Sequence, residues 1–192
     1  MNFNSKEILA ATMILFAVID IVGNIPVVIK LRNKAGHIQS LKASIIALVI
    51  MIAFVFLGES ILNIIGVNVS EFAVAGSFIL FFIALEMILG ITLFKDDEVN
   101  PKTVTVFPLA FPLLAGPGSL TSLLALRAEY HIENILVAII LNILLIYFVL
   151  KTSARIERFV GKNGIAVIQK VFGVILLAIA IKLFTTNIKA LF

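Results

Sequence analysis

The sequence predicts an all-α polytopic membrane protein with six transmembrane helices, arranged as two inverted three-helix repeats. The first observation is composition: of the 192 residues, 61% are hydrophobic and 14% are charged, and the mean hydropathy is +1.18. A soluble domain is about 45–50% apolar and about 25% charged. The second is length, since six spans of about 20 residues fit into the chain and leave only short connections. These figures exclude an ordinary soluble enzyme, a disordered chain and a nucleic-acid binder of the usual kind, and they make the lipid bilayer the expected partner.

Six apolar stretches are assigned as spans. They lie at residues 7–30, 42–65, 71–94, 104–127, 134–151 and 165–187. Because stretches such as 45–57 are apolar on every side, whereas the strands of a membrane barrel alternate apolar and polar residues, we expect helices. The first span is too long for the core of a signal peptide and is assigned to the mature protein.

A polar or glycine-containing connection bounds each span. These connections lie at residues 32–36, 66–68, 95–98, 129–131 and 161–164. Ser70, followed by Glu71, is the expected N-cap of the third helix.

Basic residues predict the orientation. Eleven of the 15 Lys and Arg residues lie in or beside the connections that follow spans one, three and five. Because cytoplasmic loops are enriched in these residues, these connections are expected inside and both termini outside. Two halves of three helices each then run in opposite directions through the membrane, a plan found in many secondary transporters. We therefore divide the single transmembrane domain, residues 1–192, into a first repeat at about 1–95 and a second at about 100–192.

The first and fourth spans are both expected to be broken near the middle of the membrane. Span one carries Gly23 and Pro26, and span four carries Pro112 and Pro117. Proline removes an amide donor and clashes with the carbonyl group four residues earlier. Unpaired backbone groups are tolerated in hydrocarbon only where they line a cavity or meet a ligand, so matched breaks predict a binding site. The alternative is that these residues form kinks for close helix packing.

Small and polar residues beside the breaks are the candidate substrate-binding residues. They are Asp20, Gly23, Asn24, Gly116, Gly118, Ser119 and Thr121. The half-helix that starts after each break offers free amides and a positive dipole end, which suit a carboxylate. A zwitterionic ligand would place its carboxylate there and its ammonium group beside Asp20 or beside carbonyl groups that the breaks release.

The depth of an ionisable residue is counted from the end of its span at a rise of about 1.5 Å per helical residue. By this count, the carboxylic acids Asp20 and Glu86 lie deep in the bilayer. Ionisable groups at that depth are expensive, so both are proton-coupling candidates. The alternatives are that Asp20 caps amides freed at the break, and that Glu86 is a protonated acid bonded to a neighbouring helix. Glu59 and Lys182 lie near the predicted outer interface, and their roles stay open.

The residues of the breaks also carry a family resemblance. Residues 110–120 resemble the signature of the MarC family, also described as six-span neutral amino acid transporters, related to the lysine-exporter superfamily. Residues 20–26 resemble the family's first-half motif, and residues 173–180 resemble its last helix. The resemblance implies a protein of the cytoplasmic (inner) membrane with a pocket between the broken spans, and proton-coupled movement of small neutral amino acids such as glycine and alanine.

Two positions depart from the family pattern. Many members have proline where this chain has Ile21, so the first break is expected to be milder. Many have glutamine where this chain has Lys182, so no role is carried over to that position.

The expected function is a secondary transporter that works by alternating access, driven by a proton or ion gradient and without a cofactor. The alternatives are an exporter or channel for another small metabolite, and a non-transport subunit of a membrane assembly. An enzyme is not expected, because the sequence has no Cys and shows no metal-ligand cluster. Its two histidines, His37 and His131, lie in connections on opposite sides of the membrane, so Ser119 would lack a general base. A homo-oligomer is left open, since lipid-facing and subunit-facing surfaces have the same composition.

Overall fold

The computed structural model describes residues 3–91 and 104–189, and the regular elements of this part of the chain are all helical. They are α1 (Ser5–Ile19), α2 (Ile25–Ala35), α3 (Ser40–Ile65), α4 (Val69–Leu89), η1 (Thr105–Leu114), α6 (Pro117–Glu129) and α7 (Ile132–Ile188). The prediction of an all-helical membrane protein is confirmed.

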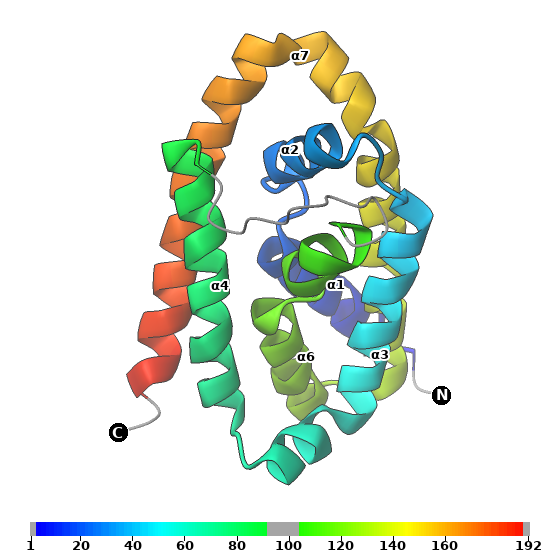
Figure 1. The fold of residues 1–192 in the computed structure, drawn as a ribbon. Coiled ribbons are helices and arrows are strands. Elements are labelled where there is room, and N and C mark those ends of the chain that lie inside the picture. Colours follow the sequence, from blue (N-terminus) through cyan, green and yellow to red (C-terminus); the bar gives the residue numbers. More distant parts are fainter. Residues whose placement is uncertain (1–2, 92–103, 190–192) are drawn as a thin grey trace.

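Within the described residues, four helical segments are long and apolar enough to cross a membrane, namely Ser40–Ile65, Val69–Leu89, Ile132–Arg155 and Ala166–Ile188. A fifth span results if η1 and α6, which are bent by 46° at their junction, are taken together. Helices α1 and α2, of 15 and 11 residues, are each too short to span alone. Both chain termini lie at the same end of the molecule, as expected for an even number of crossings (Figure 1). Six spans and an inverted repeat therefore stay predictions.

The helix of the fifth span extends beyond its predicted end at 151, and the break that follows it falls within the expected connection at 161–164. Helix α7 continues through residues 152–160 and bends only at Gly161, which has a φ of 75°. This stretch includes Ala154, Arg155 and Glu157, which are good helix formers, so its polar residues do not end the helix. Glycine reaches a positive φ without steric cost, so Gly161 turns the chain. Helix α7 thus arches over the end of the molecule opposite the termini (Figure 1).

The start of α4 also differs from the prediction. Its N-cap is Asn68 rather than Ser70, because the Asn68 side chain accepts from the Glu71 amide (2.8 Å) and the Glu71 carboxylate accepts from the Asn68 amide (2.7 Å). This reciprocal pair satisfies two backbone donors at once. Helix α4 ends at Leu89, and the predicted end of the third span at 94 and the connection at 95–98 fall outside the described residues.

Small residues let the helices approach closely. Gly76 of α4 lies directly against Pro117, the first residue of α6, and Gly173 of α7 leaves no room for a side chain beside Ile88 of α4. In Figure 1, α4 runs alongside the last part of α7. Close contact at small residues is the usual means of helix association in membranes.

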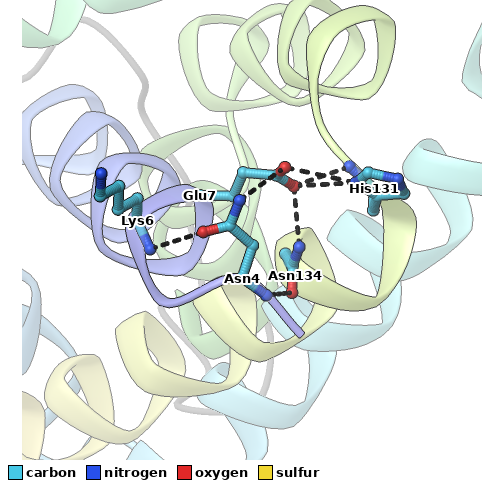
Figure 2. A network of polar contacts seen from close by, with 5 residues as sticks. All are labelled: Asn4, Lys6, Glu7, His131 and Asn134. Carbon is cyan, nitrogen blue, oxygen red and sulfur yellow. Dashed lines mark hydrogen bonds and ion pairs between the residues drawn. The ribbon is translucent and has the colours of Figure 1, made fainter. Parts of the chain in front are cut away.

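A polar cluster ties the start of α1 to the start of α7 at the end of the molecule where the termini lie (Figure 2). The Glu7 carboxylate accepts from the Asn134 side chain (2.7 Å) and from the His131 amide (3.1 Å), and the His131 ring Nδ1 also lies 3.1 Å from it. The Asn134 side chain in turn accepts from the Asn4 amide (3.2 Å). These hydrogen bonds lower the pKa of Glu7 to about 2 from its ordinary value of 4.5.

This cluster predicts a pH dependence of stability. Because the pKa of Glu7 is lower in the folded protein, the ionised group stabilises the fold above pH 4.5, and this contribution is lost as the pH falls toward 2. Replacing Glu7 with Gln is therefore expected to lower the Tm in detergent at pH 7, and the difference from the wild type should shrink as the pH falls through this range. Glu59→Gln, at an exposed position of α3, is the control. Equal Tm values for wild type and Glu7→Gln at pH 7 would contradict the prediction.

Candidate functional site

The first break is a polar turn of residues 20–24 between α1 and α2. Asp20 adopts a left-handed conformation (φ 45°, ψ 48°), and its carboxylate accepts from the Gly23 amide at 3.2 Å. The Asn24 side chain donates to the carbonyl group of Ile19 at 2.9 Å, which pairs a backbone acceptor at the end of α1. The expected capping role of Asp20 is thus observed at Gly23. Pro26 lies in the first turn of α2, where its missing amide costs no helical hydrogen bond.

The second break lies at Ala115 and Gly116, between η1 and α6. Within η1, the backbone is extended at Phe107 and Phe111, each of which precedes a proline; proline disfavours the helical conformation in the residue before it. Gly116 is extended as well and packs its α-carbon against the carbonyl oxygen of Pro112, so that no side chain fits there.

Hydroxyl groups add hydrogen bonds to backbone carbonyl groups around this break. Ser119 donates to Gly116 (3.0 Å) and reaches Leu114 (3.3 Å), and Ser122 donates to Gly118 (2.8 Å). The starts of α2 and α6 resemble each other, since each has a proline in its first turn and neither has a side-chain cap. The start of α6 offers the amides of Gly118 and Ser119. At the start of α2, by contrast, the Asn24 and Ile25 amides donate to the carbonyl groups of Asp20 and Val22.

One pocket of about 330 Å³ is bordered by both breaks. Seven of the residues singled out from the sequence line it, namely Asp20, Asn24, Pro112, Gly116, Gly118, Ser119 and Thr121. Asn24 and Ser119 are almost fully buried, at 5% and 3% exposed. The lining follows α7 from Leu176 to Asn187, toward the end of the molecule where both termini lie.

Four of the expected residues do not line this pocket. Gly23 lies behind Asp20, where its amide holds the carboxylate and its lack of a side chain makes room for it. Pro26 lies in α2, and Pro117 packs against Gly76. Glu86 lies near the other end of α4, where it forms an ion pair with Lys30 of α2 (3.8 Å).

The last part of α7 contributes pocket residues that the sequence analysis did not assign. Lys182, Thr186 and Asn187 line the pocket together with Ser122 of α6. The sequence does contain a pattern that indicates this, because Lys182 and Thr186 are four residues apart in a mostly apolar helix and so share one face. Lys182 brings a cation to the pocket that holds the Asp20 carboxylate.

Comparison with known proteins identifies the family. The model of the MarC family of integral membrane proteins matches residues 5–192. The chain belongs to this family. It is 32% identical over 198 residues to a UPF0056 membrane protein of Buchnera aphidicola, covering 97% of this chain and 98% of that protein. It is 33% identical to a UPF0056 membrane protein of Pyrococcus abyssi, with 93% and 92% covered, and 31% identical to the UPF0056 membrane protein YhcE of Escherichia coli, with 93% and 90% covered.

The match to the MarC family shows that this chain is an integral, multi-pass membrane protein, in agreement with its apolar helices. The relatives are named as membrane proteins, without a substrate. No solved structure matches the chain.

Proposed function

We propose that this MarC family member is a secondary transporter for small neutral amino acids of the glycine and alanine type, coupled to protons. The observation that supports the proposal is the pocket between the two breaks, whose described lining has one acidic and one basic side chain, Asp20 and Lys182. A zwitterion has matching charges, and at about 330 Å³ the pocket suits a small ligand.

The polar groups of the pocket divide into two sets with complementary chemistry. The Asp20 carboxylate is an acceptor for the ammonium group of the substrate. The free amides at the start of α6, beside Gly118 and Ser119, and the Lys182 ammonium group are donors for its carboxylate. A neutral amino acid carries no charge besides its ammonium and carboxylate groups, so it requires no further charged side chain in the pocket. The apolar lining at Leu80 and Leu176 would accept hydrogen or methyl as the substrate's side chain.

Contacts at the opposite end of the molecule support alternating access. The pocket extends along α7 toward the termini, while the Lys30–Glu86 ion pair joins α2 to α4 near the other end. With the termini outside, as the distribution of basic residues predicts, the pocket would face the outside and this ion pair would close the inner side. The inner membrane is the proposed location. Inward opening would require the ion pair to separate as one repeat rocks against the other.

Uptake by the purified protein in liposomes tests the proposal. We expect accumulation of labelled glycine and alanine above empty liposomes, stimulated by a proton gradient and abolished by a protonophore. Methylamine and acetate, which each carry one of the two charges of glycine, should compete poorly. Absence of uptake for every small neutral amino acid would refute the substrate class, and uptake that ignores the proton gradient would refute the coupling.

A further inference from the structure

A second concave surface, separate from the transport pocket, lies where the start of α3 meets α7. This groove, of about 540 Å³, is found at the end of the molecule opposite the termini, where α2 leads into α3 (Figure 1). Its lining includes the basic residues Arg32, Lys42 and Lys151 together with His37. No Asp or Glu is among the described residues that line it. The groove therefore concentrates positive charge that no lining carboxylate balances.

The basic side chains are held in place by contacts that leave them available to an anion. The Arg32 guanidinium donates to the Ser153 hydroxyl at 2.9 Å, which uses one of its five N–H donors. The Lys151 ammonium group lies 5.5 Å from the centre of the Tyr147 ring, a cation–π contact that consumes no hydrogen bond. Lys42 is exposed in the first turn of α3, whose start has no side-chain cap and no acidic residue. The helix dipole there adds to the attraction for an anion.

Two rows of exposed apolar residues begin at this groove. On α3, Leu41, Ile45 and Val49 follow one another at every fourth residue and are 60%, 49% and 60% exposed. On α7, Leu144 and Ile140 lie on the same helical face as Tyr147 and Lys151, and are 60% and 48% exposed. Both rows lead away from the basic residues along membrane-spanning helices. The groove is thus basic, and the exposed helix surfaces of α3 and α7 that extend from it are apolar.

We propose that this groove binds a phospholipid with a negatively charged headgroup. The phosphate lies among Lys42, Lys151 and Arg32, and the acyl chains lie along the rows on α3 and α7. Basic pockets between membrane helices on the cytoplasmic side recognise anionic headgroups in this way, and the connections that supply these bases are the ones predicted to be cytoplasmic. The assignment does not depend on what the transport pocket carries.

Native mass spectrometry of the full chain in detergent tests the site, with phosphatidylglycerol and phosphatidylcholine of identical acyl chains as probes. We expect phosphatidylglycerol to bind at least about tenfold more tightly, because each basic residue near an anionic lipid contributes about a fivefold gain in affinity. The double variant Lys42→Gln, Lys151→Gln should lose about 30-fold in phosphatidylglycerol affinity by the same reasoning. Lys6→Gln, Lys189→Gln removes two exposed lysines at the opposite end and is the matched control, expected to bind like the wild type.

A third probe separates a lipid from a soluble ligand. Glycerol phosphate carries a phosphate ester without acyl chains, and should not displace phosphatidylglycerol at concentrations where the lipid itself saturates. Equal binding of the two lipids would overturn the proposal, and so would equal phosphatidylglycerol affinity in the two double variants. Displacement of the lipid by glycerol phosphate at equal concentration would assign the groove to a soluble phosphate ester instead. All four lysines are exposed, and size-exclusion profiles matching the wild type establish that the variants are folded.

Discussion

Replacing Asp20 with Asn is expected to reduce glycine and alanine uptake about 10- to 100-fold, because a hydrogen bond to a charged group contributes about 1.5–3 kcal/mol. The substitution removes the only carboxylate among the described residues that line the transport pocket, and with it the proposed partner of the substrate's ammonium group. Of the two proton-coupling candidates, Asp20 and Glu86, only Asp20 is among the described residues that line the pocket, and we propose that it also carries the proton. The residual uptake should therefore no longer respond to a proton gradient.

The fold should survive this substitution, which makes the result interpretable. Asp20 has a positive φ of 45°, a conformation that Asn adopts more readily than other residues with a side chain. The Asn carbonyl oxygen can still accept from the Gly23 amide, as the Asp20 carboxylate does at 3.2 Å. Alanine would be a poor choice, since a left-handed residue without such a polar side chain costs about 1–2 kcal/mol.

Two further carboxylates serve as comparisons for Asp20→Asn. Glu59→Gln removes an exposed carboxylate from α3 and should transport like the wild type. Glu86→Gln removes the partner of Lys30, outside the pocket, and tests the other proton-coupling candidate. If Asp20→Asn retains gradient-driven uptake while Glu86→Gln loses it, coupling resides at Glu86 and the role proposed for Asp20 is wrong.

Local chemistry explains why much of the site could be predicted from the sequence. Gly116 and Pro117, and the polar turn that begins at Asp20, act on the backbone within a few residues of themselves, so their effect is visible without knowledge of the packing. The breaks lie beside these residues, at 20–24 and at 115–116. The helical class follows from composition for the same reason, because hydrocarbon allows few structures whose backbone is fully paired.

Tertiary packing explains what the sequence did not reveal. Residues 152–160 contain several polar and charged side chains, which favour a connection, and only the arch of α7 shows that they continue a helix. From the sequence, Lys182 is predicted to lie at the membrane interface. In the structure, the last part of α7 places it in the lining of a pocket that α1 and α6, which are distant in the chain, also form. From the sequence, Glu86 is predicted to be an acid deep in the bilayer. In the structure, α2 places the Lys30 ammonium group 3.8 Å from its carboxylate. Each of these depends on a contact between distant segments.

The contact between Gly76 and Pro117 gives the second large effect that we expect. Gly76 is buried in α4 and lies directly against the proline ring that begins α6, next to the break that borders the pocket. Replacing Gly76 with Val places three carbon atoms where the ring lies. Overpacking of this kind costs about 1–3 kcal/mol, and the strain falls on the start of α6. We expect a lower Tm in detergent together with a marked loss of uptake.

Ala75→Val is the matched control, because it adds to the neighbouring residue of the same helix the side chain that Gly76→Val introduces. Ala75 is exposed, so its enlarged side chain meets lipid or detergent instead of α6. By helix propensity alone, Gly76→Val should gain slightly and Ala75→Val should lose slightly, so a larger drop in Tm for Gly76→Val reports the packing against Pro117. A Tm and an uptake rate that are the same in the two variants would mean that α4 does not pack on the start of α6 in the membrane. The second break would then lack the neighbour that holds it in place, and the pocket geometry proposed for substrate binding would be wrong with it.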